Sequence, residues 1–347
     1  MRTITLTPAR TLLSLTRWVG RSFMPRPIIL MYHRVAELPA DPQLLAVRPA
    51  RFAEQLEVLR ADFRPRSLSD LLSGLHDGRF GRRTVVITMD DGYADNLVAA
   101  KPLLERFAIP ATVFVATDYI GRVREFWWDE LERLLLQPGH LPQVVRLRLD
   151  GRSPTWEMGE AAEYSPDDYE RDRWWHVDQD YDPGPRQRVY RALYQLLHQL
   201  PDADKWALLD ELRLLVGAEP GGRATHRTLT PDELVRLADG GLIEIGAHTA
   251  THPALAGIPL AKQRQEIEGS KAMLEATLNR PISSFAYPHG SYGEDTVCAV
   301  ADAGFNCACT SDPQRVARSS NPFRLPRVVP RDWDGDTFAR WLTEWVG

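Results

Sequence analysis

Two adjacent carboxylates and a pair of histidines are the residues of this sequence best suited to chemistry. Asp90 and Asp91 directly follow the apolar run Thr84–Met89, and His248 and His252 follow a second apolar run. Adjacent carboxylates at the end of a buried strand repel each other and lose hydration unless a cation compensates them. Two imidazoles four residues apart can face one ion, and two histidines with one carboxylate leave coordination positions open. These residues therefore predict a catalytic metal site, because a structural site would be closed.

Short apolar runs that alternate with segments of helical periodicity predict the elements that position these residues. Such alternation indicates parallel strands joined by crossover helices, and seven strands favour a closed or nearly closed barrel. The carboxyl ends of barrel strands form one face, so side chains that follow different strands should converge there. The expected strands are Pro27–Tyr32, Thr84–Thr88, Ala111–Ala116, Leu242–Ala247, Ile282–Tyr287, Asn306–Thr310 and Arg324–Val329. The expected helices are 51–61, 94–107, 231–239, 259–278 and 293–303.

Residues 121–225 interrupt this alternation. The segment is polar, has helical periodicity without a good strand, and holds six of the ten tryptophans. We expect a mainly helical insertion with a small core of its own, placed between the third and fourth strands, and a long loop at Tyr164–Pro185. The barrel is then expected to comprise residues 27–120 and 226–347, preceded by a basic arm at residues 1–26.

Charge and hydropathy exclude some classes of partner. Lys and Arg total 42 against 47 acidic residues, a formal charge of −5, so no net positive field favours nucleic acid. No apolar stretch approaches the roughly 18 residues of a membrane-spanning helix. The arm has five arginines and no acidic residue, and its apolar stretch Thr11–Leu15 is too short for a secretory signal. We expect a cytoplasmic protein whose arm docks on the body or, alternatively, lies on a membrane surface.

Three motifs of the chain resemble those of the polysaccharide deacetylases, the NodB-homology carbohydrate esterases of family four. Thr88–Tyr93 resembles their first motif, His248–His252 the second and Ala286–Gly290 the third. Leu30–Val35 and Arg324–Arg327 are also similar to family elements. The resemblance implies a distorted (β/α)7 barrel of parallel strands and the removal of N-acetyl, or sometimes O-acetyl, groups from sugars.

The resemblance also implies roles for the residues of these motifs. Asp91, His248 and His252 would be the metal ligands, and Asp90 the general base. A bound cation lowers the pKa of a coordinated water, Asp90 takes the proton, and hydroxide attacks the acetyl carbonyl. The backbone N–H of His289 would help to stabilise the negative oxygen that forms. Zn²⁺ is the expected ion because imidazole suits it, although Co²⁺, Ni²⁺ and Fe²⁺ fit the same ligand set.

The chain departs from the family pattern at two positions. Its third motif begins with Ala286 where the family usually has an arginine that orients the catalytic aspartate. The family's late histidine acid is missing too, since no histidine follows His289. We expect Arg327, at the end of the last strand, to replace the missing arginine as the partner of Asp90. For the acid we expect His33, which ends the first strand, with His289 as the second choice; a structural role for His33 is nearly as compatible with the sequence.

Further motif residues are expected to line the substrate pocket. These are Tyr93 from the first motif and Tyr287, Pro288 and Gly290 from the third, although Tyr93 is equally compatible with a packing role. Tryptophans of the insertion can stack on sugar rings, or alternatively fill the insertion's core. The remaining histidines, His198 among them, have no partner in the sequence pattern and are expected to have no role.

Together the motifs favour a metal-dependent hydrolase that removes N-acetyl groups from an acetylated sugar, glycolipid or polysaccharide. One alternative is a catalytically silent carbohydrate-binding protein on the same barrel. The two departures motivate this alternative, whereas the intact set of Asp90, Asp91, His248 and His252 counts against it. A second alternative is a metal amidohydrolase that uses the same site on a non-sugar amide.

Overall fold

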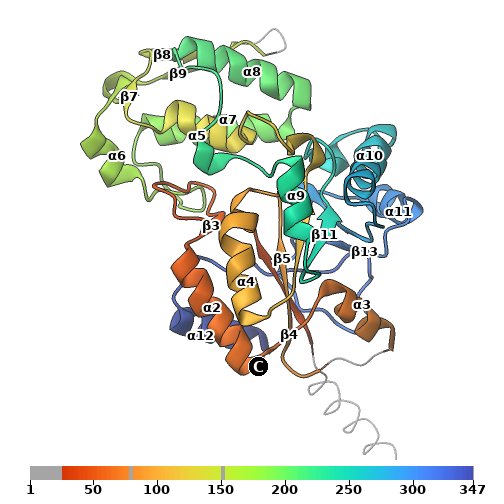
Figure 1. Ribbon diagram of the computed structural model, residues 1–347. Helices are drawn as coiled ribbons and strands as arrows, with labels where there is room; N and C mark the ends of the chain where they lie inside the picture. Colours follow the sequence, from red (N-terminus) through yellow and green to blue (C-terminus); the bar gives the residue numbers. More distant parts are fainter. Residues whose placement is uncertain (1–25, 78–80, 150–152, 347) are drawn as a thin grey trace, which may run out of the picture.

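A curled, seven-stranded parallel sheet forms the body of the protein, and a mainly helical lobe stands over one end of it (Figure 1). The computed structural model describes residues 26–77, 81–149 and 153–346, so the predictions for the arm lie outside the described residues. In order across the sheet the strands are β1 (Ile28–Tyr32), β5 (Thr84–Met89), β6 (Ala111–Val115), β11 (Ile243–Ala247), β12 (Ser284–Ala286) and β13 (Cys307–Cys309), and β4 (Arg64–Pro65) pairs with the start of β5. The expected distorted barrel of parallel strands is confirmed.

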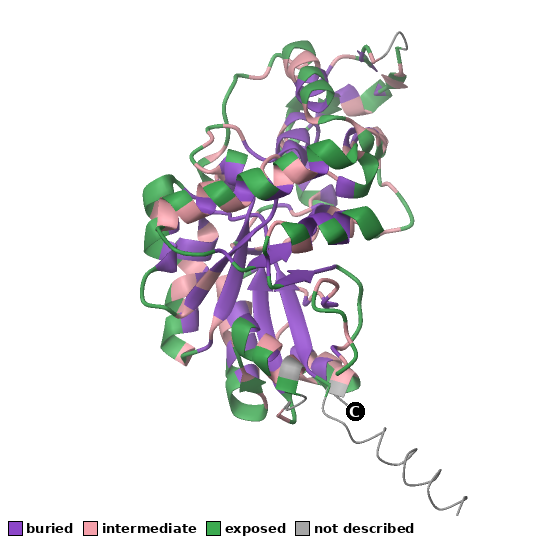
Figure 2. Cartoon of the chain, turned by 90° about the vertical axis from the view of Figure 1, so that its right-hand side faces the viewer, coloured by how far each residue is buried: buried purple, intermediate pink, exposed green. Residues whose placement is uncertain are grey.

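The strands are buried on both faces, which explains why they appear in the sequence as continuous apolar runs. In β1, Ile28 and Leu30 belong to the core between sheet and helices, whereas Ile29 belongs to the core inside the barrel. Figure 2 shows the buried strands at the centre and the exposed helix faces around them. The helices that pack on the outer core are α2 (Pro49–Asp62), α4 (Lys101–Phe107), α9 (Pro231–Ala238), α10 (Leu260–Leu278), α11 (Glu294–Asp302) and α12 (Gly335–Val346).

The predicted helix after Thr230 is confirmed as α9, and its start has the predicted cap. The Thr230 hydroxyl accepts from the Glu233 N–H, and the Glu233 carboxylate accepts from the Thr230 N–H, with Pro231 in the first turn. Two helices of the barrel were not expected: α12, and α3 (Leu68–Asp77), which contributes Leu68 and Leu71 to the core inside the barrel.

The prediction of a strand at Arg324–Val329 is wrong. Only two isolated parallel bridges form there, from Leu325 to Cys309 in β13 and from Val328 to Leu30 in β1. Pro326 lies between the two bridging residues and has no N–H to donate, so a continuous ladder cannot form. The segment nevertheless lies between the two edge strands of the sheet and partly closes the barrel. The seventh strand of the sheet is instead β4, which has only two residues.

The lobe has a core to which Tyr93, Ala116 and Tyr119 of the preceding segment also contribute. It contains short strands, which corrects the prediction of none. Its helices are α5 (Trp127–Leu135), α6 (Pro166–Asp172), α7 (Pro185–Gln199) and α8 (Asp202–Leu215), and its strands are β7 (Gly139–His140), β8 (Val144–Arg146), β9 (Thr155–Glu157) and β10 (Glu163–Tyr164). They pair antiparallel as β7 with β10 and β8 with β9. Helix α6 lies in the stretch expected to be a loop, because Ser165 and Asp168 form a capping box before it. Four of the segment's six tryptophans are buried in this core: Trp127, Trp128, Trp175 and Trp206.

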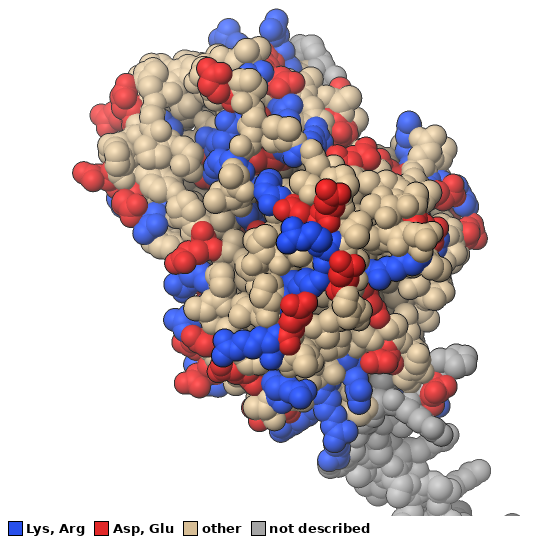
Figure 3. All heavy atoms as spheres, in the orientation of Figure 1, with Lys and Arg blue, Asp and Glu red and all other residues tan. Residues whose placement is uncertain are grey.

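The surface carries both charges. On the face shown in Figure 3, Lys and Arg side chains are interspersed with Asp and Glu side chains, so that face presents no field of a single sign. Among the described residues, no helix has both the length and the apolar character that a membrane crossing requires.

Candidate metal and catalytic site

Asp91, His248 and His252 come together at the carboxyl ends of β5 and β11. One ligand atom from each lies within 4.8 Å of the others, and all three side chains are buried. The Asp91 Oδ1 atom is 3.6 Å from His248 Nε2 and 3.3 Å from His252 Nε2, and the two Nε2 atoms are 3.2 Å apart. Three donor atoms that converge in this way without a cationic side chain among them form a group suited to a metal ion.

The orientation of His248 supports the same interpretation. Its Nδ1 atom lies 2.8 Å from the carbonyl oxygen of Ala286, the first residue of the third motif. Because a carbonyl oxygen can only accept, Nδ1 carries the proton and Nε2 presents its lone pair to the other two ligand atoms. A backbone carbonyl on the neighbouring strand therefore fixes the tautomer that metal binding requires.

Strained turns present all three ligand side chains. Asp91 has a φ of 76°, Thr249 65° and His252 60°, in the left-handed region that side chains with a Cβ rarely adopt. Such conformations cost on the order of 1–3 kcal/mol each and persist only where the surroundings impose them. At Gly92, with a φ of 81°, a Cβ would lie 2.8 Å from Val115 Cγ1, so the turn after the two aspartates requires glycine.

Glu266 of α10 holds the loop between the two histidine ligands. Its carboxylate accepts hydrogen bonds from the N–H groups of Ala250 and Thr251 at 2.9 and 2.8 Å, and from the Thr251 hydroxyl at 2.8 Å. These bonds tie the loop to a helix of the barrel. Glu266 was not predicted as a site residue, because it lies outside the motifs and nothing in the sequence connects it with the histidine loop.

Asp90 forms a buried, two-pronged ion pair with Arg327. The distances are 2.7 Å from Arg327 Nη1 to Oδ1 and 2.7 Å from Nη2 to Oδ2. The guanidinium also donates to the Thr310 carbonyl oxygen and to the Thr88 hydroxyl, so its plane is fixed. Burial raises the pKa of Asp90, but the charges of Arg327 and His248 and the hydrogen bonds from Arg327 outweigh burial and lower the pKa to about 2. Arg327 thus occupies the position beside Asp90 that we expected for a substitute of the missing arginine.

These residues line a cavity of about 100 Å³. The predicted residues on its wall are His33, Asp90, Asp91, His248, His252, Tyr287, His289, Gly290 and Arg327. The wall also contains residues that the sequence analysis did not select, namely Met31, Gln43, Leu45, Trp128, Tyr194 and Ser311. The predicted pocket residues Tyr93 and Pro288 are buried and do not contribute to the wall.

The correction for Tyr93 has a clear physical reason. Its ring is fully buried in the core of the lobe, and the Arg34 guanidinium lies 4.3 Å from the ring centre. The Tyr93 hydroxyl donates to Asp129 Oδ2 at 2.7 Å and accepts from Trp128 Nε1 at 2.9 Å. Tyr93 therefore packs against and orients Trp128, which lines the cavity, while Tyr93 itself is not part of the cavity wall.

The two histidines considered for the acid occupy different surroundings. His33 lines the cavity, and burial lowers its pKa against the raising effects of Asp91 and Asp90. His289 has a φ of 56°, and its ring centre lies 4.5 Å from that of His252 and 4.4 Å from that of His198. Burial, His252 and His198 lower the pKa of His289. His198, to which the sequence analysis gave no role, thus packs directly against a residue of the third motif.

The lobe supplies part of the cavity wall through α5 and α7. Trp128 belongs to α5, Tyr194 to α7, and burial followed by the charge of Asp91 raises the pKa of the Tyr194 hydroxyl to about 12. Tyr190, Tyr194 and His198 recur every four residues and so share one face of α7. That spacing is a signal by which the sequence could have indicated a functional face of this helix.

Comparison with known proteins agrees with the motifs. The family model described as polysaccharide deacetylase matches residues 77–141 and 179–308, which is more than half of the chain. The putative polysaccharide deacetylase YxkH of Bacillus subtilis is 28% identical over 115 residues, 33% of this chain and 41% of that protein. An uncharacterized protein of Streptomyces coelicolor, SCO4760, is 38% identical over 72 residues, 21% of this chain and 28% of that protein. The alignments therefore span less than half of these curated relatives.

Solved structures show the same fold at low sequence identity. The Streptococcus pyogenes deacetylase PplD, solved in complex with acetate, superposes with a TM-score of 0.57 at 17% identity, covering 93% of this chain and 98% of that one. IcaB from Ammonifex degensii superposes with a TM-score of 0.57 at 16% identity, and the match covers 93% of this chain and 97% of IcaB. The putative polysaccharide deacetylase BA0330 from Bacillus anthracis superposes with a TM-score of 0.55 at 16% identity, and the match covers 92% of this chain and 69% of BA0330. With its fold, its three motifs and the matched family model, the chain belongs to the polysaccharide deacetylase family.

Proposed function

We propose that the protein is a metal-dependent N-deacetylase of an acetylated amino sugar, polysaccharide or glycolipid. One observation carries the proposal: the buried Asp90–Arg327 pair and the group of Asp91, His248 and His252 face the same small cavity. A binding protein without catalysis has no need of a deprotonated carboxylate held beside a potential metal site.

The three ligand side chains fit a divalent ion, and Zn²⁺ is the ion that we propose. Their donor set is two imidazoles and one carboxylate, and the proton of His248 is held on the nitrogen that points away from the group. When bound, such an ion acts as a Lewis acid and lowers the pKa of a water molecule. Asp91, His248 and His252 would hold it.

The remaining residues of the site have roles that follow from their positions. The Asp90 carboxylate accepts a proton from the attacking water, because Arg327 keeps it deprotonated. The N–H of His289 lies at the start of a single helical turn, η6 (Pro288–Gly290), where backbone N–H groups have no partner within the helix, and it donates to the developing oxyanion. An imidazole nitrogen of His33 takes over the proton that Asp90 accepted from water and delivers it to the leaving amine, so that both residues return to their starting forms.

The size of the cavity favours a small acyl group over a whole sugar ring at the reacting position. Pockets that enclose drug-sized ligands measure about 300–1,000 Å³, well above the 100 Å³ found here. An acetamido group can enter, while the sugar ring stays outside the reacting position; Trp128 and Tyr194 of the lobe contribute aromatic side chains to the cavity wall.

The test is acetate release by purified protein, stripped of metal and then reloaded with Zn²⁺, from N-acetylglucosamine oligomers and polymers and from O-acetylated sugars. We expect the reloaded protein to release acetate from N-acetylated glycans, the metal-stripped protein to release none, and Asp90→Asn to lose the activity. The matched control Asp239→Asn changes an exposed carboxylate and should retain full activity. Metal-loaded protein that binds glycans but releases no acetate from any of them would support the silent binding protein instead, and release only from simple amides would support the non-sugar amidohydrolase.

A further inference from the structure

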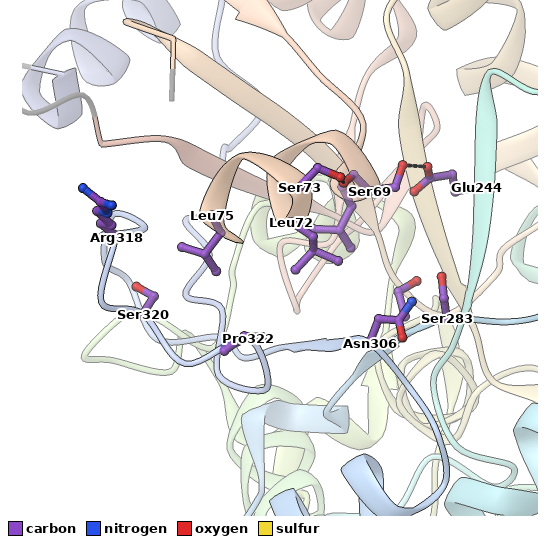
Figure 4. Close-up of a pocket in the computed structure, with 12 residues that line it drawn as sticks. Ser69, Leu72, Ser73, Leu75, Glu244, Ser283, Asn306, Arg318, Ser320 and Pro322 are labelled. Atoms are coloured by element: carbon purple, nitrogen blue, oxygen red, sulfur yellow. Dashed lines mark hydrogen bonds between the residues drawn. The ribbon is translucent and has the colours of Figure 1, made fainter. Parts of the chain in front are cut away.

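A groove of about 520 Å³ lies at the amino ends of the strands, the end of the sheet opposite to the candidate metal site. Glu244 of β11 and Ser284 of β12 lie near the starts of their strands, and Asn306 immediately precedes β13. Figure 4 shows α3 along one side of the groove, and the segment that carries Arg318, Ser320 and Pro322 along another.

The carboxylate of Glu244 in this groove has no cationic partner. It accepts hydrogen bonds from the hydroxyls of Ser69, drawn in Figure 4, and of Thr112, the latter at 3.3 Å. Across the described part of the chain, no Lys, Arg or His forms an ion pair with it. A half-buried carboxylate that has only neutral donors retains most of its negative charge uncompensated, so the groove favours a cationic ligand group.

Beside Glu244 lie polar side chains that lack hydrogen-bond partners. Ser284 is only 5% exposed, yet its hydroxyl donates to no described residue and accepts from none. The hydroxyl of Ser283 and the side-chain amide of Asn306 likewise form no hydrogen bond with the described residues, although both line the groove. Ser283 and Asn306 are exposed, so this row of polar side chains is free to bind a ligand with several hydroxyl or amide groups.

The groove also has an apolar strip, which lies beside Ser69 and Ser73 of α3, while Arg318 lines the groove at the end away from Glu244 in Figure 4. Leu72 and Leu75 project from α3, and Pro322 lies across from them in Figure 4. A ligand that fits this groove therefore has one positive group, several hydroxyls and one face of C–H groups. A pyranose ring with a free amine combines these three properties, because its ring C–H groups form an apolar face and its amine is protonated at neutral pH.

We propose that the groove is a binding site for saccharides with free amino groups, with the ammonium on Glu244 and the ring hydroxyls on Ser283, Ser284 and Asn306. The proposed deacetylase function is the source of such a ligand, since removing an acetyl group converts a neutral acetamide into an ammonium. The site would then retain the product strand of a partly deacetylated polymer at the end of the barrel away from the reacting cavity. The N-acetylated form lacks the positive charge and binds weakly.

Calorimetric titration of the full chain with glucosamine trimer, N-acetylglucosamine trimer and ethanolamine tests the proposal. We expect the glucosamine trimer to bind at least tenfold more tightly than the other two ligands, and Glu244→Gln to weaken it at least tenfold. Asn306→Ala, which keeps the carboxylate, should weaken it less, and the control Glu268→Gln, an exposed residue of α10, should change nothing. Acetate release should be unchanged in Glu244→Gln.

Three results would overturn the proposal: no binding of the glucosamine trimer, equal binding of ethanolamine, or binding that Glu244→Gln and Asn306→Ala both leave intact. Thermal unfolding of each variant establishes that a loss of binding is not a loss of folding. The titrations use metal-stripped protein, in which the N-acetylated trimer is not turned over, and dependence on Glu244 distinguishes the groove from the reacting cavity, so the two proposals fail separately. Glu244-dependent binding without acetate release would remove the deacetylase function alone, and acetate release without such binding would remove the groove alone.

Discussion

Replacing Arg327 by methionine removes the positive charge beside Asp90 but retains much of the length of the side chain. The wild-type pair has two contacts of 2.7 Å and both side chains are buried, so the variant leaves a buried carboxylate without its partner. Breaking a buried pair in this way typically costs about 3–5 kcal/mol. The lowering of the Asp90 pKa from 3.8 to about 2 corresponds to roughly 2 kcal/mol at 1.36 kcal/mol for each tenfold change. We therefore expect Arg327→Met to lose about 2–5 kcal/mol of folding free energy near neutral pH.

The sign of the pH dependence follows from the direction of the Asp90 pKa. A carboxyl whose pKa is lower in the folded state stabilises the protein above its unfolded pKa, near 3.8, and this stabilisation disappears as pH falls towards 2. In Arg327→Met, burial raises the pKa of Asp90 with less opposing charge. The acidic limb of the pH–rate profile should therefore move to higher pH, while the difference in stability between the two proteins should shrink at low pH.

Urea unfolding at several pH values and the pH–rate profile of acetate release measure both effects. Arg327→Lys keeps the charge but not the two-pronged geometry, so it should recover part of the stability and part of the acid limb. The matched control Arg324→Met removes a nearby arginine whose pair with Glu294 is largely exposed, and it should change little. An Arg327→Met protein with wild-type urea midpoints and an unmoved acid limb would refute the conclusion that Arg327 holds Asp90 deprotonated.

Three further predictions concern the metal group and the sheet. Asp91→Asn should abolish tight Zn²⁺ binding in equilibrium dialysis without unfolding the chain; retention of a full equivalent of zinc would contradict the assignment. Glu266→Gln should lower Zn²⁺ affinity about 10–100-fold and change the Co²⁺ absorption spectrum, because its hydrogen bonds orient the loop between His248 and His252, while Glu266→Asp should recover part of the loss. Gly246→Ala should lower the free energy of unfolding in urea by about 1–3 kcal/mol, since the added Cβ would collide with the ring of Phe114 on the neighbouring strand β6. An unchanged urea midpoint would show that the Phe114 ring can move away.

The carboxyl-end residues of the barrel could be predicted because the signal is local. An apolar run that ends in Asp90 and Asp91, and another that ends in a histidine pair, each place their side chains at a strand end. Parallel pairing brings those ends to one side of the sheet, so convergence follows without knowledge of the loops. The placement of Arg327 beside Asp90 was predictable for the same reason, even though its segment forms two isolated bridges instead of a strand.

The contribution of the lobe could not be predicted in the same way. Trp128 and Tyr194 lie on helices whose apolar faces serve both the core of the lobe and the wall of the cavity, and helical periodicity does not separate the two uses. Tyr93 shows the converse ambiguity, because pocket and packing roles were equally compatible with its sequence position. A tyrosine directly after a catalytic-looking motif appeared to belong to the pocket, but the lobe covers it and uses its hydroxyl to orient Trp128.

The barrel and the lobe contribute different kinds of residue to the cavity. Every residue that we assign to proton transfer or metal binding lies on a strand end or a loop of the barrel, whereas the lobe adds Trp128 and Tyr194 to the cavity wall. Under the proposed function, changes in α5 or α7 would therefore alter which sugar is accepted without disturbing Asp90, Arg327 or the three ligand side chains. Because function depends on the site rather than on the fold, relatives of similar fold but low identity give little information about the glycan that this lobe admits.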